Sequence, residues 1–231
     1  MSIAQPDPSS ADPAVGGAGK VFCVGLNKTG TTSLAAALRE LGYRVADQPE
    51  AERLLPCWQR RDFAPIVAFA AGADAFQDIP FSLPFTYQAL HAAYPEARFI
   101  LSLRESAEAW YDSQMRFMVR LYGRVPDAED LRGTRYGYPG FMYEAKRAQL
   151  PELGDDALFD RTSHLEFYER HRRNVLQYFG DSPRFLVLNP AWPDSYARLC
   201  RFLDRPPQRE RMPHLNRSRP AAPAASTAPP P

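Results

Sequence analysis

Short runs of apolar residues alternate with longer stretches of helical periodicity along most of the chain. The apolar runs predict buried strands at residues 20–26, 73–78, 97–104 and 184–190. Leu34, Leu38 and Leu41 recur at helical spacing before Gly42, and glycine is a common residue just past a helix end. Further helical patterns cover residues 84–93, 106–122 and 194–204. Strands separated by helices predict an α/β fold, with three α/β/α layers around a central parallel sheet.

The middle of the chain departs from this alternation. Residues 123–140 are rich in glycine, proline and charge, and predict a mobile loop. A helical hairpin should follow, and its second arm is predicted to begin at Ser163, which has capping-box spacing to Glu166. The apolar stripe of that arm consists of Leu165, Tyr168, Val175, Leu176 and Phe179.

Both ends of the chain lack a hydrophobic pattern. Residues 1–19 contain proline, serine, aspartate and glycine, and residues 218–231 are rich in alanine and proline. Such segments bury too little apolar surface to offset the entropy lost on ordering, so we expect disordered tails. The predicted folded domain covers residues 20–217.

The overall composition is that of one ordinary globular domain, with 45% hydrophobic and 24% charged residues. A formal charge of +1 argues against nucleic acid or membrane as a partner, so any anion site must be built locally. Cys23, Cys57 and Cys200 are widely spaced and predict free thiols. Without an apolar leader or membrane span, the expected location is the cytoplasm.

The turn after the first predicted strand has the residues of an anion-binding loop. Residues 25–33 read GLNKTGTTS and precede a helix, whose first amides and positive dipole end favour an anion. Gly25 and Gly30 permit close approach, Lys28 adds charge, and three hydroxyl residues follow. In the common nucleotide-binding loop the lysine follows the second glycine, whereas Lys28 precedes Gly30. This arrangement favours charge compensation without a metal ion.

With this loop, the chain resembles the sulfotransferases that use PAPS (3′-phosphoadenosine 5′-phosphosulfate), in particular a group with short chains from bacteria and fungi. The resemblance covers nearly all of the predicted domain. GLNKTGTTSL is similar to the family's 5′-phosphosulfate loop, and ARFILSLRESAEAWYDS, residues 97–113, is similar to the strand and helix that hold the 3′-phosphate. The segment LCRFLDRPPQRERMPHLN is similar to the end of that group's domain. The resemblance implies a P-loop NTPase-like sulfotransferase fold.

The resemblance also implies roles for individual residues. Lys28 would bind the phosphosulfate and stabilise charge that grows on the departing phosphate. The implied donor-binding residues are Asn27, Lys28, Thr29, Gly30, Thr31, Thr32, Ser33, Arg104 and Ser113. Arg104 would grip the 3′-phosphate, because a guanidinium fork suits two oxygens at once. Ser113 falls one residue later than the family's usual serine, and Ser106 is its rival.

Sulfuryl transfer to a hydroxyl or amine requires a base near the acceptor. Relatives place histidine or glutamate after the second strand, where this chain has Asp78. Asp78 is therefore the first candidate for the base, and this role requires partial burial that raises its pKa. Capping of the turn by Asp78 is an equally good interpretation. His171, in FYERHRRNV, is the rival base.

The sequence gives the least information about the acceptor. A small molecule or carbohydrate is expected, and eight aromatic residues are candidates to line its pocket: Phe81, Phe85, Tyr87, Trp110, Tyr136, Tyr138, Phe141 and Tyr143. Two other functions stay open. A magnesium- and ATP-dependent kinase shares the sheet and loop, and would use Asp78 at the metal. A non-catalytic, nucleotide-binding regulator is the third possibility.

Overall fold

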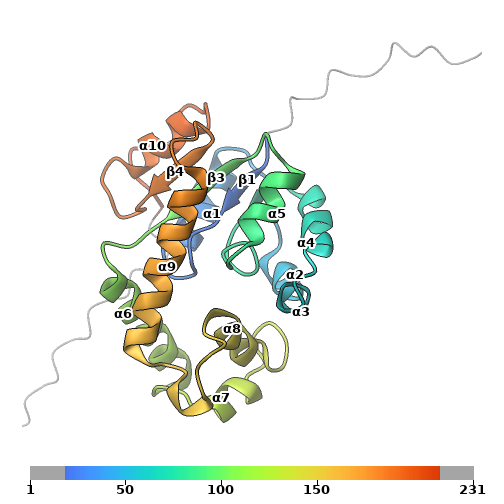
Figure 1. The fold of residues 1–231 in the computed structure, drawn as a ribbon. Coiled ribbons are helices and arrows are strands. Elements are labelled where there is room, and N and C mark those ends of the chain that lie inside the picture. The colour runs from blue at the N-terminus through green and yellow to red at the C-terminus, as the bar shows by residue number, and fades with distance from the viewer. Residues whose placement is uncertain (1–18, 214–231) are drawn as a thin grey trace, which may run out of the picture.

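The computed structural model describes residues 19–213, and in this part four strands form one parallel sheet in the order β2-β1-β3-β4 (Figure 1). The strands are β1 (Val21–Cys23), β2 (Ala75–Phe76), β3 (Arg98–Ser102) and β4 (Phe185–Leu188). The predicted disordered tails lie outside the described residues, apart from Gly19. The domain limits of 20 and 217 therefore stay a prediction.

Helices follow each strand and fill the connections. They are α1 (Thr31–Glu40), α2 (Gln48–Glu52), α3 (Leu55–Gln59), α4 (Ala64–Phe69), α5 (Thr86–Ala93), α6 (Ala107–Tyr122), α7 (Ala128–Gly133), α8 (Phe141–Gln149), α9 (Arg161–Phe179) and α10 (Ser195–Phe202). Within residues 19–213, none of the helices has the length and apolar character that crossing a membrane requires.

Different helices cover the two faces of the sheet, because successive strand residues point to opposite sides. Val21 and Cys23 pack against residues of α1 and α10. Phe22 and Phe99 pack against residues of α4, α5 and α9, and α9 crosses in front of the sheet (Figure 1). The predicted three-layer α/β/α class is therefore confirmed.

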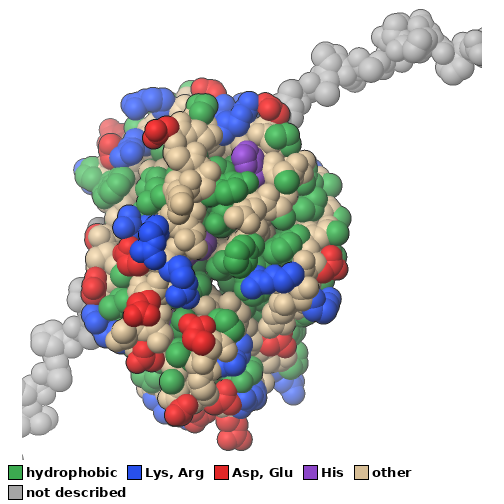
Figure 2. Space-filling model, viewed as in Figure 1, with side chains coloured by type: hydrophobic (Ala, Val, Ile, Leu, Met, Phe, Trp, Pro, Cys, Tyr) green, Lys and Arg blue, Asp and Glu red, His purple; other side chains and the backbone are tan. Residues whose placement is uncertain are grey.

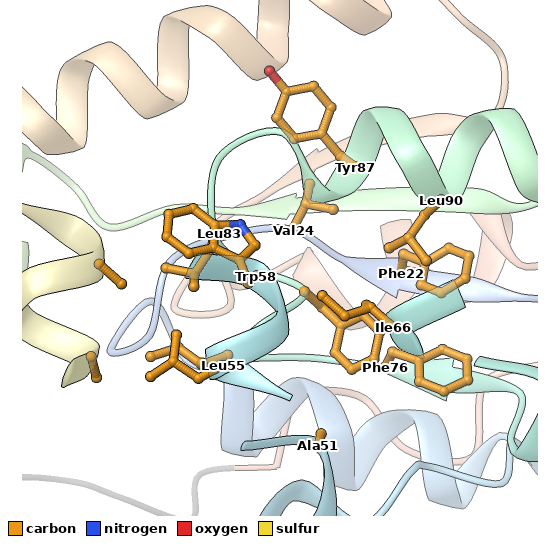
Figure 3. Close-up of a cluster of buried hydrophobic side chains, with 14 of the residues drawn as sticks. Phe22, Val24, Ala51, Leu55, Trp58, Ile66, Phe76, Leu83, Tyr87 and Leu90 are labelled. Carbon is orange, nitrogen blue, oxygen red and sulfur yellow. The ribbon is translucent and has the colours of Figure 1, made fainter. Parts of the chain in front are cut away.

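Phe22 lies at the centre of the larger core. Its ring centroid is 5.1 Å from that of Phe76 on β2 and 5.4 Å from that of Phe99 on β3. Ile66 and Leu90 close the same cluster from the covering helices (Figure 3). Aromatic packing of this kind contributes more than buried area alone, and it fixes the three strands whose carboxyl ends support the site.

The segment predicted as a mobile loop contains a helix, which corrects that prediction. Helix α7 begins after Asp127, whose side chain accepts a hydrogen bond from the backbone amide of Asp130. The Asp130 carboxylate in turn accepts a hydrogen bond from the backbone amide of Asp127, which completes a capping box. The spacing of Asp127 and Asp130, three residues apart, was a sign in the sequence that a helix begins here. Helices α7 and α8 pack together and lie away from the sheet (Figure 1).

Two further details differ from the sequence prediction. Helix α9 begins at Arg161, because the side chain of Asp160 accepts a hydrogen bond from the amide of Ser163. The prediction of the cap at Ser163 is thus wrong, because the N-cap residue is Asp160, three positions earlier. Residues 48–69, for which the pattern predicted no element, form the short helices α2, α3 and α4. Each has a proline in its first turn, a position where the missing amide hydrogen costs nothing.

We expect Gly25→Ala to lower the free energy of unfolding by about 1–3 kcal/mol, as overpacking does in other cores. A Cβ atom at Gly25 would lie 2.2 Å from Ser102 Oγ and 2.3 Å from the Ser102 carbonyl oxygen. Urea unfolding followed by circular dichroism measures the change. Gly72→Ala is the control, since no atom lies within 4 Å of its added Cβ. An unchanged midpoint for Gly25→Ala would contradict this close approach of β1 and β3.

Candidate functional site

A cleft of about 730 Å³ opens at the carboxyl ends of the strands. It is lined by the loop between β1 and α1, by Asp78 after β2, by Arg104 after β3 and by Asn189 after β4. All the candidate residues predicted for donor binding line this cleft: Asn27, Lys28, Thr29, Gly30, Thr31, Thr32, Ser33, Arg104 and Ser113. The strand order therefore brings together residues that are far apart in the sequence.

The loop turns through left-handed backbone conformations before α1 begins. Lys28 has a φ of 69° and Gly30 has a φ of 92°. A Cβ atom at Gly30 would lie 2.9 Å from Pro190 Cγ, so glycine satisfies both the backbone angle and the close approach. A lysine with positive φ is uncommon and stores strain that surrounding contacts must hold.

Two polar residues of the loop hold it in place. The hydroxyl of Thr29 donates to the Leu26 carbonyl at 2.6 Å and lies 2.6 Å from Ser102 Oγ. Thr29 is almost fully buried, so its hydroxyl faces inward. The Asn27 carbonyl oxygen accepts a hydrogen bond from Trp110 Nε1 at 2.9 Å, and Asn27 Oδ1 accepts one from Gln114 Nε2 at 2.9 Å. The loop is thus fastened to β3 and to α6.

The Lys28 side chain lies in the cleft and forms no salt bridge within residues 19–213. Its Nζ atom is 4.2 Å from the centre of the Phe117 ring, a cation–π contact. Burial lowers the pKa of Lys28, and the nearby Arg120 lowers it further, while Asp78 opposes the change. A lysine in these surroundings gains from an anion that neutralises it.

Arg104 joins the loop to α6. Its Nε atom donates to the Lys28 carbonyl at 2.7 Å, and its Nη2 atom donates to Ser113 Oγ at 3.1 Å. Ser106 instead caps α6, accepting a hydrogen bond from the Ala109 amide at 3.2 Å. The geometry therefore pairs Arg104 with Ser113, the first of the two serines considered from the sequence.

Positive charge gathers on the α6 side of the cleft. Arg116 and Arg120 lie one turn apart on α6 and line the cleft with Lys28 and Arg104. Within residues 19–213, none of these four side chains forms a salt bridge. Figure 2 shows basic and acidic side chains mixed over one whole face of the molecule. Four cations without a salt bridge in one cleft suit an anionic ligand.

Asp78 lies on the other side of the loop, also with a left-handed φ, of 61°. Its carboxylate accepts hydrogen bonds from the Thr31 hydroxyl at 3.3 Å and from the Ile79 amide at 3.0 Å. Burial raises the pKa of Asp78, although these two hydrogen bonds and Lys28 oppose the change. A carboxylate with a raised pKa is a better proton acceptor at neutral pH.

His171 lies outside the cleft lining and faces the sheet. Its Nε2 atom is 2.8 Å from the Val24 carbonyl oxygen, so this nitrogen carries the hydrogen and donates. Burial lowers the pKa of His171 to about 4. The side chain is therefore a buried, neutral donor that supports β1, and only Asp78 of the two candidate bases lines the cleft.

Several cleft residues were missed from the sequence. Glu52 on α2 and Lys146 on α8 are both nearly buried, and Lys146 Nζ lies 3.0 Å from His164 Nε2. Gln114 Oε1 and Asn189 Nδ2 are buried and lack a hydrogen-bond partner within residues 19–213. The predicted strand at residues 184–190 included Asn189, whereas β4 ends at Leu188 and leaves Asn189 at the strand end. Among the same residues, no three metal-binding side chains come together.

The parallel sheet and the loop before α1 define a P-loop-like α/β protein, and the loop and the dipole end of α1 have the features of an anion site. A family model described as "Sulfotransferase domain" matches residues 20–220, and the chain belongs to this family. It is also 27% identical over 215 residues to "Ava biosynthesis cluster protein M" of Aspergillus versicolor, an alignment that covers 85% of this chain and 80% of that protein.

We expect His171 to stay neutral in the folded protein from pH 8 to about pH 5, because its imidazole is removed from water. Its folded pKa of about 4 is below the usual unfolded value of about 6.5. The stability it contributes is thus present above pH 6.5 and is lost as the pH falls toward 4. Nitrogen-15 NMR of the imidazole ring measures the midpoint, with the protein in urea as control. A native midpoint near 6.5 would contradict the burial of His171 as a neutral donor to Val24.

Proposed function

We propose that the protein is a PAPS-dependent sulfotransferase, which transfers a sulfuryl group to a hydroxyl or amine of a small-molecule or carbohydrate acceptor. The arrangement of Arg104 carries this proposal. One guanidinium group contacts the carbonyl of Lys28 and the hydroxyl of Ser113, so it connects the loop proposed for the phosphosulfate with the residues proposed for the 3′-phosphate.

The residues of the cleft fit a donor with two separate anionic groups. The loop, Lys28 and the first amides of α1 would hold the phosphosulfate. Arg104 and Ser113 would hold the 3′-phosphate, since their hydroxyl and guanidinium hydrogens suit phosphate oxygens. Gln114 Oε1 and Asn189 Nδ2, buried without partners among the described residues, give the cleft one further acceptor and one further donor.

PAPS supplies a sulfuryl group that is activated by its bond to the 5′-phosphate. The acceptor oxygen or nitrogen forms a bond to sulfur, the bond from sulfur to the phosphate oxygen breaks, and its electron pair leaves with the phosphate. Lys28 and the α1 amides stabilise the negative charge that grows there. Asp78 takes the acceptor proton on its carboxylate and later releases it to solvent.

The proposed acceptor region lies between the loop and the helices away from the sheet. Of the aromatic residues considered from the sequence, Tyr136 lines the cleft, with Met142 and Ala145 of α8 nearby. Phe81, Tyr87, Trp110 and Phe141 are instead buried in the core clusters. A mixed wall of a phenol, a thioether and small apolar groups suits a small organic acceptor.

A magnesium- and ATP-dependent kinase is the second candidate function, favoured by one contact. The Thr31 hydroxyl at the start of α1 donates to Asp78 at a strand end. P-loop kinases use a hydroxyl and an aspartate of this kind to hold magnesium. The two functions differ in the nucleotide they require.

We expect PAP (3′-phosphoadenosine 5′-phosphate) to bind in EDTA, and Arg104→Ala to weaken its binding at least tenfold, about 1.4 kcal/mol. The substitution removes the fork that bonds Ser113. Lys28→Ala should also weaken binding, because it removes the cation of the loop. Calorimetric titration with PAP and ATP, in EDTA and then in magnesium, gives the four affinities.

Arg173→Ala is the matched control for charge, since Arg173 is exposed on α9 and does not line the cleft. It should bind PAP as the wild type does. Preference for ATP that appears only with magnesium would contradict the sulfotransferase proposal and favour the kinase. If PAP binds but single-turnover transfer from PAPS fails with every acceptor class, the non-catalytic regulator gains support.

For Asp78→Asn we expect a loss of kcat of about 10²–10⁴-fold, the usual effect of losing a general base. PAP affinity should change little, because Asp78 is not among the residues proposed to hold the donor. Single-turnover transfer measured with radiolabelled PAPS and calorimetry separate the two effects. Unchanged kcat with normal PAP binding would limit Asp78 to a structural role at its turn.

A further inference from the structure

Lys146 is a buried amine of the cleft that the proposed chemistry leaves unused. It lies on α8, only 4% of its surface is exposed, and it lines the cleft together with Met142 and Ala145 of the same helix. Within residues 19–213, Lys146 forms no salt bridge. A buried ammonium group without an anion beside it is costly to keep charged, so an anionic ligand would stabilise this side chain.

His164 holds the Lys146 amine in place from α9. Its Nδ1 atom is 2.8 Å from the Asp160 carbonyl oxygen, which can only accept, so Nδ1 carries the hydrogen. In the neutral ring Nε2 then has the lone pair, and it accepts a hydrogen bond from Lys146 Nζ at 3.0 Å. Burial and the charge of Lys146 lower the pKa of His164 to about 4, which keeps the ring neutral. This contact uses one of the three hydrogens of an ammonium group.

The remaining surroundings of the amine are apolar. The centre of the Phe159 ring is 4.9 Å from Lys146 Nζ, a cation–π contact. Burial lowers the pKa of Lys146 to about 7, which places it among the groups that a bound anion would protonate at neutral pH. Among the described residues, His164 is the hydrogen-bond partner of the Lys146 side chain, so the other hydrogens of the ammonium group can serve a ligand in the cleft.

Gln114 supplies an unpartnered hydrogen-bond acceptor in the same cleft. It lies on α6 with only 1% of its surface exposed. Its Nε2 atom donates to Asn27 Oδ1 at 2.9 Å, and its Oε1 atom is buried without a partner within residues 19–213. Gln149, one turn after Lys146 on α8, donates its Nε2 to the same Asn27 oxygen at 3.3 Å. Asn27 thus brings this part of α8 together with Gln114 on α6.

The two side chains make different demands on a ligand. The hydrogens of Lys146 favour an anionic oxygen, whereas Gln114 Oε1 requires a hydroxyl or N–H group. An ionised phosphate or sulfate oxygen meets the first demand, but the amide oxygen of Gln114 repels it. A carboxylate whose neighbouring carbon bears a hydroxyl or N–H group meets both demands.

We propose that Lys146 and Gln114 form a subsite for the acceptor substrate, which binds its carboxylate and the hydroxyl or N–H group next to that carboxylate. This inference rests on the proposed function and narrows the acceptor to a hydroxy acid, an amino acid or a sugar acid. Met142 and Ala145 line the cleft beside this subsite and suit an apolar part of the same molecule. Since Asn27 directly precedes Lys28, the subsite borders the loop proposed for the phosphosulfate.

The test is NMR of the full chain with its lysines labelled with carbon-13 at Cε, with PAP and again without it. The chain has only three lysines, Lys20, Lys28 and Lys146, so three signals are expected. Glycolate and mandelate are the probes, because each has a hydroxyl next to a carboxylate, and their uncharged amides are the controls.

We expect each acid, at millimolar concentration, to shift the Lys146 signal saturably and to raise its pH midpoint, because an anion stabilises the ammonium form. The amides should leave the Lys146 signal unchanged, and the Lys20 signal should move with neither. Acetate lacks the hydroxyl that Gln114 Oε1 would accept from, so it should bind more weakly than glycolate. Equal affinities for acetate and glycolate would contradict the role of Gln114.

Lys146→Met tests the amine itself, with a side chain of similar length and no charge. Both acids should bind at least tenfold more weakly, while PAP affinity stays within twofold of wild type. Lys20→Met is the matched control, because Lys20 does not line the cleft, and it should bind the acids as the wild type does.

The outcomes separate this inference from the proposed function. A Lys146 signal that neither acid shifts overturns the subsite, whether or not PAP binds. PAP that shifts the Lys146 signal and competes with the acids assigns Lys146 to the donor, and this also overturns the subsite. If the acids bind as expected but PAP fails to bind in EDTA, the sulfotransferase proposal fails and the carboxylate site stands without it. Acids that bind beside PAP support both.

Discussion

The Lys28 carbonyl oxygen accepts a hydrogen bond from Arg104 Nε, and Lys28 itself has a left-handed backbone. The rest of the cleft depends on this contact. It holds the strained loop against the strand that precedes α6, while the other end of the same guanidinium contacts Ser113. Because strain of this kind persists only where surrounding contacts over-determine it, Trp110 and Thr29 act as further fasteners of the loop. These contacts fasten the loop to β3 and to α6.

The order of the strands distributes charge along the cleft. The end of β2 brings Asp78, β1 brings the loop, and β3 brings Arg104. Acidic groups consequently lie on the side of α2, and unpaired cations on the side of α6. A parallel sheet has all its carboxyl ends at one edge. Asp78, the loop and the arginines therefore lie side by side across the cleft, in the order of the strands that precede them. The proposed base thus lies on the acidic side of the cleft, and the proposed donor site extends from the loop to the cationic side.

The sequence was sufficient to predict the α/β class and the loop, because strand and helix periodicity is local and the motif is compact. It also named Arg104 and Ser113, which meet through the geometry of one strand and one helix. It did not reveal Glu52, since the short helices at residues 48–69 are defined by packing and proline positions rather than by a long apolar stripe. Nor did it reveal that His171 supports β1, because the histidine's partner, the Val24 carbonyl, is 147 residues away in the chain.

Helices α2 and α8 do not follow directly on a strand of the described sheet, yet they supply Glu52, Met142 and Lys146 to the cleft. The loop, Arg104 and Ser113 come from the strand ends and from α6. The chain thus assigns the two walls of the cleft to different stretches of sequence. Substitutions in one stretch can therefore alter one wall of the cleft and leave the other wall intact. If the proposed function holds, substitutions on α2 and α8 would change the acceptor wall and leave the proposed donor wall unaltered.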